Sequence, residues 1–266
     1  MVDRYAVIGN PVAHSKSPWI HARFARQTGQ AIEYGAILAP IDGFARTVAD
    51  FRAAGGRGAN VTLPFKRDAF RLAARTSERA RAAQAVNTLM LETESPYGDN
   101  TDGAGLTGDL QRNLGFDLAG KRVLLMGAGG AAQGVVLPLL EARPSRLAIA
   151  NRTAYKARDL AGRFPPASGG GYAELAGEQF DLVINATSAG LTGELPALPE
   201  AIFARGALAY EMVYGRDTPF LRLARESGAA TSDGLGMLVE QAAESFYLWR
   251  GVRPDTAPVL AALRGA

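Results

Sequence analysis

Cysteine is missing from this chain of 266 residues. Its absence excludes disulfide bonds, thiolate catalysis and metal sites built on cysteine, and only two histidines, His14 and His21, are left to supply a zinc site. No uninterrupted apolar run approaches the roughly 18 residues that a membrane-spanning helix needs. The first residues also lack the basic, apolar and small-residue regions of a secretory signal. We therefore expect a soluble, cytoplasmic protein with no metal and no membrane partner.

Lysine is scarce as well. Of 29 basic residues, four are lysine: Lys16, Lys66, Lys121 and Lys156. Arginine stays charged near neutral pH, whereas a lysine ammonium exchanges a proton when its surroundings shift its pKa. Lys66 closes the segment 60–66 and is the first candidate for acid–base chemistry, although genome composition can also favour arginine over lysine. The net charge is only +3, and no basic stripe indicates a nucleic-acid partner.

Short apolar stretches alternate with helical patterns along the whole chain. Strands are expected at 5–8, 32–38, 58–62, 85–91, 122–126, 147–150, 182–185 and 208–212. Helices are expected at 18–27, 64–73, 131–141 and 155–163, with Pro64 in the first turn of the second. This alternation favours βαβ units and an α/β fold with mainly parallel sheets. The turn-rich stretch 96–103 looks like a domain junction, and 168–171 is expected to be a loop.

One glycine-rich segment carries a binding mechanism. It follows an apolar strand, opens a helix and fits the pattern G-x-G-x-x-A, with the residues Gly127, Ala128, Gly129, Gly130, Ala131 and Ala132. In this context glycine permits a tight turn and lets the backbone approach a pyrophosphate, which lies on the helix N-terminus. The segment therefore predicts dinucleotide binding in a Rossmann domain.

The end of the next strand indicates which dinucleotide is bound. Sites that prefer NAD place an Asp or Glu there to bind the ribose hydroxyls, but this chain has Asn151, Arg152 and Thr153. No carboxylate would repel a 2′-phosphate, and Arg152 could hold one bidentately. The alternative is that Thr153 caps the following helix and Arg152 is a surface residue. Since capping and phosphate binding are compatible, we expect NADP as the cofactor.

Several polar side chains suit a small ligand with many hydroxyl groups. They include Ser15, Ser17, Thr62, Asn87 and Gln241. A site built from such groups rejects analogues that leave its hydrogen bonds unpaired. Each residue also has a purely structural reading: Ser17 could cap a helix before Pro18, and Thr62 or Asn87 could satisfy loop backbone.

In their order and spacing, the polar segments resemble those of the shikimate dehydrogenases, NADP-dependent enzymes of aromatic amino-acid biosynthesis. The resemblance runs from Val7 to about Asp255 and rests on segments 15–18, 60–66, 85–88, 99–103, 151–153, 185–188 and 234–241. It implies reversible reduction of 3-dehydroshikimate to shikimate by a monomer or homodimer. It also implies a substrate domain of residues 1–103 and 238–266, a Rossmann domain of residues 104–237, and an active cleft between them.

The resemblance implies a role for each matching residue. Lys66 and Asp102 would be catalytic. Ser15 and Ser17 would bind the carboxylate of the substrate. The ring hydroxyls of the substrate would be bound by Thr62, Asn87, Asp102 and Gln241, and Tyr214 would also reach the substrate. The pyrophosphate would bind residues 127–131, and the adenosine phosphate Asn151, Arg152, Thr153 and Lys156. Met212, Gly234, Met237 and the acidic Glu78 would lie toward the nicotinamide.

Two questions stay open at this point. Lys66 could transfer the proton with Asp102 as its orienting partner, or the two could titrate as a coupled pair. A quinate/shikimate dehydrogenase that uses NAD or NADP, and a non-catalytic NADP-binding regulator, are the alternative functions. The chain also departs from the family pattern at two places. Glu211 stands where the family usually has aspartate, and the loop from Tyr214 to Pro219 is one residue shorter than the common loop.

Overall fold

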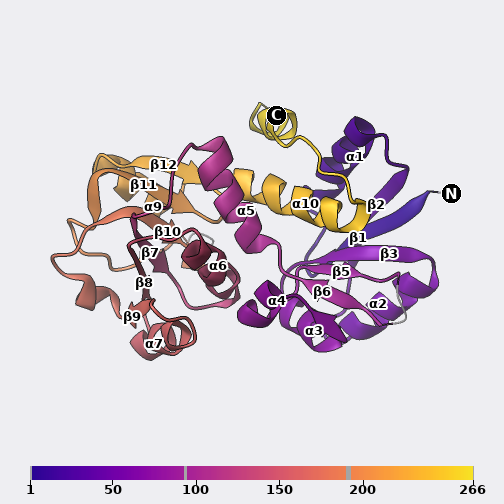
Figure 1. Ribbon diagram of the computed structural model, residues 1–266, viewed down its shortest axis with the longest axis horizontal. Helices are drawn as coiled ribbons and strands as arrows, with labels where there is room; N and C mark the ends of the chain where they lie inside the picture. Colours follow the sequence, from indigo (N-terminus) through magenta and orange to yellow (C-terminus); the bar gives the residue numbers. More distant parts are fainter. Residues whose placement is uncertain (1, 93–94, 190–192, 266) are drawn as a thin grey trace. The chain divides into compact units, whose positions relative to one another are not determined.

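The computed structural model describes residues 2–92, 95–189 and 193–265 of the chain, which divides into two compact units. Unit 1 consists of Met1–Gly105 and Leu238–Ala266, and unit 2 of Leu106–Met237. The first unit is therefore completed by the C-terminal segment of the chain (Figure 1). None of the described helices is long and apolar enough to cross a membrane.

Unit 1 is built on a mixed sheet. Its elements are β1 (Asp3–Gly9), α1 (Ser17–Thr28), β2 (Ile32–Leu38), α2 (Phe44–Ala53), β3 (Gly56–Val61), α3 (Lys66–Leu72), β4 (Arg75–Thr76), α4 (Glu78–Ala83), β5 (Thr88–Met90), β6 (Tyr97–Asp99) and α11 (Ala257–Arg264). The described strands lie in the order β2-β1-β3-β5-β6-β4. β1 is parallel to β2 and β3, whereas β5 is antiparallel to β3 and β6.

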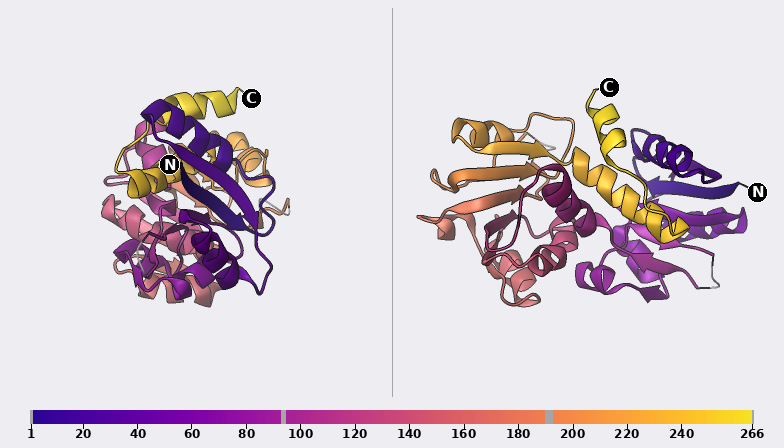
Figure 2. Two further views of the ribbon diagram at one scale, coloured as in Figure 1. Left: turned by 90° about the vertical axis from the view of Figure 1, so that its right-hand side faces the viewer. Right: turned by 45° about the horizontal axis from the view of Figure 1, so that its top comes forward.

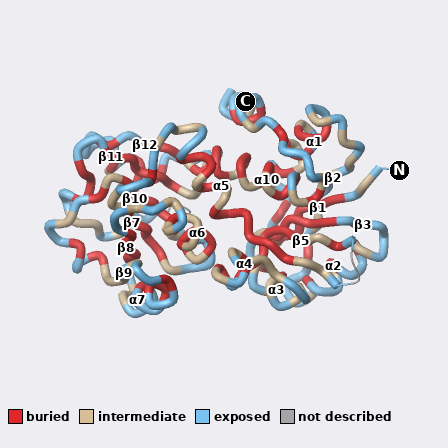
Figure 3. The backbone as a smooth tube through the Cα atoms, in the orientation of Figure 1, coloured by how far each residue is buried: buried red, intermediate tan, exposed pale blue. Residues whose placement is uncertain are grey.

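Alternation along β1 explains the two covered faces of this sheet. Ala6 and Ile8 point into a core that contains Phe65, from the turn before α3, and side chains of α2. Tyr5, one position earlier, points the other way and stacks on Trp249 at 4.7 Å between ring centroids. Trp249 belongs to α10 (Leu235–Arg250). Each such large buried side chain stabilises the fold by about 1.5–3 kcal/mol. Most residues of the central strands β1 and β3 are buried (Figure 3).

Unit 2 contains a parallel sheet in doubly wound order. Its elements are η1 (Asp109–Asn113), β7 (Arg122–Met126), α6 (Gly130–Glu141), β8 (Arg146–Ala150), α7 (Ala154–Gly162), β9 (Ser168–Gly170), η2 (Tyr172–Leu175), β10 (Phe180–Asn185), β11 (Phe203–Glu211), α9 (Pro219–Glu226) and β12 (Ala230–Asp233). The described strands lie in the order β12-β11-β10-β7-β8-β9, all pairs parallel (Figure 2). The chain reverses direction across the sheet between β7 and β10, which is where open α/β sheets bind ligands. The predictions of an α/β fold and a Rossmann domain are confirmed.

Two helices belong partly to each unit. α5 (Asp102–Gly108) begins in unit 1, and α10 ends in it. In unit 2, Gly236 at the start of α10 lies against the carboxylate of Asp109, because a Cβ at Gly236 would be 1.9 Å from Asp109 Oδ1. The Tyr210 hydroxyl donates to the same carboxylate over 2.6 Å. Only glycine fits at position 236.

Some predicted elements are wrong in detail. The helix expected at 64–73 begins at Lys66, because Thr62–Phe65 forms a turn closed by a 3.0 Å bond from Phe65 N to Thr62 O. Residues 85–87 are not part of a strand, since Val86 N donates to Lys66 O. The stretch 96–103 contains β6 and the start of α5.

The loop expected at 168–171 is also wrong, because Ser168–Gly170 is a strand paired with β8. A sequence of small residues is unusual in a strand, but the packing requires it here. A Cβ at Gly169 would lie 2.3 Å from Ala157 O in α7. The glycine therefore allows the helix backbone to lie directly on the edge strand.

Candidate functional site

The candidate substrate residues of unit 1 gather at one edge of its sheet. Parallel β1 and β3 end at this edge, at Gly9 and Val61. Because β5 is antiparallel to β3, it begins at the same edge, with Thr88 opposite Asn60. β6 returns to it, with Asp99 opposite Thr88. The register therefore brings four separate chain segments together.

Lys66 and Asp102 meet at this edge. Lys66 Nζ donates to Asp102 Oδ2 over 2.6 Å, and the two side chains are 26% and 9% exposed. The turn after β3 places Lys66 at the first position of α3. Asp102 opens α5, and its backbone N–H donates to Asn100 Oδ1 over 3.1 Å. The pair is partly shielded from water and still open on the lysine side.

Asn87 and Gln241 extend the same cluster. Asn87 Nδ2 donates to Asp102 Oδ1 over 2.9 Å and to Thr101 Oγ1 over 2.9 Å, and lies 3.3 Å from Gln241 Oε1. The side-chain oxygen of Asn87, Oδ1, accepts from Thr101 N over 2.8 Å. Gln241 belongs to α10, so the C-terminal segment supplies part of the cluster. Of the sequence-predicted residues, Lys66, Asn87, Asp102 and Gln241 are linked in one hydrogen-bonded group.

Ser15, Ser17 and Thr62 reach this edge from the segments that follow β1 and β3. Ser17 is the first residue of α1 and is buried, while Lys16 occupies the capping position, so the reading of Ser17 as helix cap is wrong. Ser17 N lies 3.3 Å from Ser15 Oγ. Thr62 N donates to Ile8 O over 3.0 Å. These backbone bonds fix where Ser15, Ser17 and Thr62 stand at the edge.

A partly buried ion pair precedes the loop that carries Asp102. Arg79 donates to both oxygens of Asp99, over 2.7 and 2.8 Å, and to Glu244 Oε1 over 3.0 Å. Burial alone would raise the pKa of Asp99, but the hydrogen bonds and charge of Arg79, with the Ser77 hydroxyl, bring that pKa below its usual value. Asp99 also accepts from the next residue's N–H, so the ion pair fixes the start of this loop.

The glycine-rich segment of unit 2 has the geometry of a ligand-binding turn. Gly127 directly follows β7 and has a φ of +108°, which disfavours other residues. Gly129 precedes the first turn of α6. Added Cβ atoms at Gly129 and Gly130 would meet nothing within 4 Å. No packing demand therefore explains these two glycines.

The end of β8 presents basic side chains without a carboxylate. Asn151 Nδ2 donates to Thr153 O over 3.0 Å and orders the turn. Thr153 stands at the capping position of α7, but its side chain makes no capping bond, so the capping alternative is wrong. Arg152 and Lys156 are exposed.

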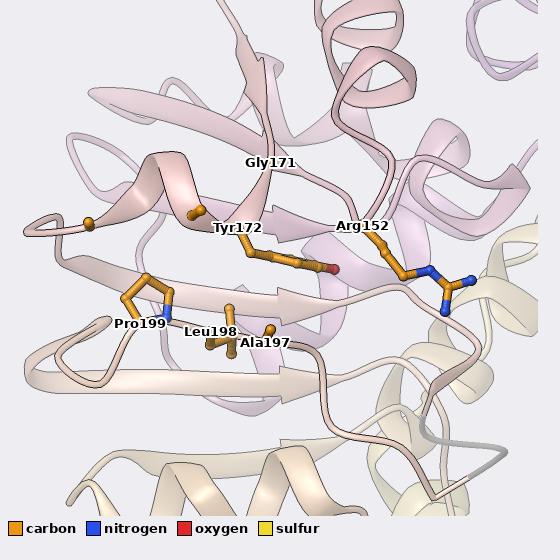
Figure 4. A pocket seen from close by; sticks show the side chains of 8 residues that line it. Arg152, Gly171, Tyr172, Ala197, Leu198 and Pro199 are labelled. Carbon is orange, nitrogen blue, oxygen red and sulfur yellow. The ribbon is translucent and has the colours of Figure 1, made fainter.

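Arg152 also lines a cavity of about 560 Å³ in unit 2. Its other walls are mostly apolar: Gly171, Tyr172, Ala173, Ala176, Ala197, Leu198 and Pro199. Figure 4 shows the Tyr172 ring extending toward Arg152. Burial raises the pKa of Tyr172 to about 12, and the charge of Arg152 opposes this. The volume is within the range of small-molecule sites.

The remaining candidates lie at several places. Met212 follows β11 and is half-buried, and Met237 is buried in α10. Gly234 has a packing reason, because an added Cβ would lie 2.2 Å from Met212 O. Tyr214 is half-buried, and burial raises its pKa. Glu78 is exposed at the start of α4, in unit 1.

Glu211 has a clear structural role. It is fully buried and accepts from Asn185 Nδ2 over 2.8 Å and from Thr218 Oγ1 over 3.0 Å. Burial raises its pKa, and the hydrogen bonds from Val213 N, Asn185 and Thr218 oppose that rise. The side chain thus joins the ends of β10 and β11 to the residue that caps α9.

Sequence reasoning assigned no role to several buried polar residues near Asp102. Asn60, Thr88, Thr101 and Ser245 form a connected group behind the edge of the sheet. Asn60, Thr88 and Thr101 lie within segments that had been singled out. Ser245 is four residues after Gln241 on one helix, and this spacing places both side chains on the same face of the helix, which was the signal available in the sequence.

Three parts of the chain match family descriptions of shikimate dehydrogenases, and the whole chain matches a known protein of that name. Residues 7–89 match the shikimate dehydrogenase substrate binding domain, residues 109–192 match shikimate / quinate 5-dehydrogenase, and residues 234–264 match the shikimate 5'-dehydrogenase C-terminal domain. The chain is 60% identical to the shikimate dehydrogenase (NADP(+)) of Methylobacillus flagellatus over 270 residues, which covers 100% of both chains.

Solved structures of known enzymes have a similar fold over almost the whole chain. The fold is similar to that of an Ael1 enzyme from Pseudomonas putida, with a TM-score of 0.95 and 52% identity over 98% of each chain. It is also similar to the shikimate 5-dehydrogenase of Thermus thermophilus in complex with NADP(H) and shikimate. The TM-score is 0.88, with 34% identity over 99% of each chain.

Proposed function

Because the chain belongs to the shikimate dehydrogenase family, we propose that it catalyses the reversible reduction of 3-dehydroshikimate to shikimate with NADPH. This is a step of the shikimate pathway toward chorismate and the aromatic amino acids. One observation carries the proposal: Lys66 and Asp102 are paired at 2.6 Å within a cluster of neutral amide and hydroxyl groups. Such a cluster suits a small ligand with several hydroxyls.

Lys66 is the proton-transfer group in this proposal. Reduction of a ketone leaves negative charge on its oxygen, and an ammonium at that oxygen stabilises the charge and donates a proton. In the reverse direction the neutral amine accepts the alcohol proton. Asp102 orients the ammonium through Oδ2, while Asn87 holds Oδ1. Asp102, Asn87, Thr62 and Gln241 would bind the ring hydroxyls, and Ser15, Ser17 and Tyr214 would complete the substrate site.

The residues of unit 2 fit NADP. The turn at Gly127 and the open space at Gly129 and Gly130 accommodate a pyrophosphate on the first turn of α6. Arg152 and Lys156, with Asn151 and Thr153, would hold the 2′-phosphate, and the cavity beside Arg152 would take the adenosine group. Met212, Gly234, Met237 and Glu78 would lie toward the nicotinamide. When bound, NADPH supplies the hydride.

Steady-state kinetics test this function. Rates are measured with shikimate and with quinate, each with NADP and with NAD. A high kcat/KM for shikimate with NADP alone supports the proposal. Equal activity on quinate, or equal use of NAD, would instead support a quinate/shikimate dehydrogenase. Binding of NADP without turnover of either alcohol would support a non-catalytic regulator.

We also infer a cytoplasmic protein that is a monomer or a homodimer. Cell fractionation tests the location, and light scattering on the purified protein tests the oligomeric state. Recovery with the membrane fraction, or a mass above that of a dimer, would contradict the inference.

A further inference from the structure

Ser245 occupies the centre of the polar group behind the candidate substrate site. It lies in α10 and is completely buried. Its Oγ donates to Gln241 O over 3.0 Å and accepts from Asn60 Nδ2 over 2.9 Å. Two further hydroxyls lie within hydrogen-bond distance, Thr88 Oγ1 at 2.8 Å and Thr101 Oγ1 at 3.2 Å. One side chain thus joins four chain segments.

Each of these segments presents a residue of the proposed substrate site. Asn60, on β3, precedes Thr62 by two positions, and Thr88 directly follows Asn87. Thr101 directly precedes Asp102, and Gln241 is itself a proposed ligand. We propose that Ser245 is a positioning residue, which sets the spacing of the substrate-binding groups without touching the substrate.

Hydrogen bonds carry this effect to the reacting pair. Thr101 Oγ1 accepts from Asn87 Nδ2, which also donates to Asp102 Oδ1. The other oxygen of Asp102 accepts from Lys66. Loss of the Ser245 hydroxyl leaves the Thr101 hydroxyl with two remaining acceptors, Asn87 Oδ1 at 3.2 Å and Gln241 Oε1 at 3.4 Å, and so weakens the hold on Asn87 and Asp102. Catalytic groups must be held to about half an ångström, so a small shift lowers the rate.

Loss of the Ser245 hydroxyl should lower the stability of the fold less than it lowers the catalytic rate. Asn60 Nδ2 keeps other acceptors, since Asn87 O and Thr88 Oγ1 each lie 3.2 Å from it. The buried donor is therefore not left unpaired when Ser245 is replaced. A variant should fold and show its defect in the kinetics.

A graded pair of variants tests the proposal. Ser245→Ala removes the hydroxyl, and Ser245→Cys keeps the size but bonds weakly. At a temperature where circular dichroism shows both folded, we expect kcat/KM for shikimate to fall about 10- to 100-fold in Ser245→Ala and less in Ser245→Cys. The KM for NADP should stay within twofold of the wild-type value. All the proposed cofactor residues except Glu78 belong to unit 2, whereas Ser245 belongs to unit 1.

Thr47→Ala is the matched control. Its hydroxyl also donates to a carbonyl four residues earlier, Gly43 O at 3.0 Å, in unit 1. We expect wild-type kinetics from it. A kcat/KM for shikimate within twofold of wild type in both Ser245 variants would overturn the proposal. A rise in the KM for NADP as large as the loss in kcat/KM for shikimate would overturn it too. If Ser245→Ala does not fold, Ser245→Cys alone decides.

The inference rests on the proposed function, and the two fail differently. A wild-type protein that turns over neither shikimate nor quinate contradicts the function before any variant is made. An active wild type whose Ser245 variants match it contradicts only the role of Ser245.

Discussion

Lys66 Nζ lies 2.6 Å from Asp102 Oδ2, although 36 positions separate the two residues in the sequence. A turn after β3 brings in the lysine, and a loop after β6 brings in the aspartate. Each is the counter-ion of the other in a partly buried place. Removing either one leaves the other charge without its counter-ion, although Asn87 still donates to Asp102 Oδ1 when Lys66 is absent.

Replacement of Lys66 by alanine should abolish most of the turnover. General acid–base catalysis contributes about 100- to 10,000-fold, so we expect kcat to fall by about that factor. The KM for shikimate should change little, because the interaction strengthens mainly in the transition state. Steady-state kinetics in the direction of shikimate oxidation provide the measurement.

Two other substitutions make this result specific. Lys66→Arg keeps the positive charge but cannot release a proton near neutral pH, so its kcat should be nearly as low. Lys121→Ala removes a lysine that lies over the Phe116 ring in unit 2, and should leave kcat unchanged. A Lys66→Ala enzyme with wild-type kcat would remove Lys66 from the mechanism.

The strands and the glycine-rich turn could be predicted because their signals are local. An apolar run that leads into glycines indicates a strand ending in a tight turn, and Arg122–Met126 was predicted with its observed bounds. The turn Thr62–Phe65 could not be predicted in this way. Pro64 is compatible with a helix start, and the turn is fixed by long-range contacts of Phe65 in the core.

The candidate site was predictable as a set of residues but not as a network. Asn87 and Asp102 could be named from their segments. Their bond depends on β5 and β6 returning to the end of β3, which is a property of the sheet register. Ser245 lay outside every segment that had been singled out, and its position four residues after Gln241 on one helix was the signal that pointed to it.

Replacement of Arg152 by alanine should weaken NADP selectively. A charge-assisted hydrogen bond contributes about 1.5–3 kcal/mol, so the KM for NADP should rise about 10- to 100-fold. The KM for NAD, which lacks the 2′-phosphate, should change little. Arg158→Ala, on the helix α7 that follows Arg152, is the control, because Arg158 is paired with Glu174 at 2.7 Å. An equal loss with both cofactors would contradict a 2′-phosphate role.

The two glycines Gly127 and Gly129 should respond differently to alanine. Gly127→Ala forces a side chain into a φ of +108° and should lower the free energy of unfolding by about 1–2 kcal/mol. Gly129 has an ordinary φ and no atom within 4 Å of an added Cβ, so Gly129→Ala should fold normally. Its methyl group would occupy the space of the pyrophosphate and raise the KM for NADP.

Urea unfolding and NADP kinetics on both variants separate these effects. Gly177→Ala is a control for backbone strain alone, since Gly177 has a φ of +79° and an added Cβ there would meet nothing within 4 Å. It should lose stability without a change in the KM for NADP. If Gly129→Ala binds NADP as wild type does, the pyrophosphate does not lie on this turn.

His21 should make the stability of unit 1 depend on pH. The ring is fully buried, stacks on Tyr34 at 4.1 Å, and has no hydrogen-bond partner for either nitrogen among the described residues. Burial lowers its pKa from 6.5 to about 3, and the nearby Asn60 side chain acts in the opposite direction. The folded protein therefore holds the neutral ring over a pH range in which the unfolded chain binds a proton.

The sign of the effect follows from this difference. Above pH 6.5 neither state protonates His21, and its contribution is constant. As the pH falls from 6.5 toward 3, only the unfolded state gains the proton, so the free energy of unfolding falls by up to about 1.4 kcal/mol per pH unit. Between pH 7.5 and 5 the loss from His21 should be about 2 kcal/mol.

Substitution of His21 by phenylalanine should remove this loss. Phenylalanine keeps a ring to stack on Tyr34 but does not titrate, while every other titrating group remains in both proteins and cancels in the comparison. Urea unfolding at pH 7.5, 6 and 5 should therefore show the variant gaining on the wild type as the pH falls. His14→Gln, at an exposed position, should follow the wild-type curve. Parallel curves for wild type and His21→Phe would mean that His21 binds its proton at the same pH in the folded and the unfolded protein, which contradicts the lowered pKa.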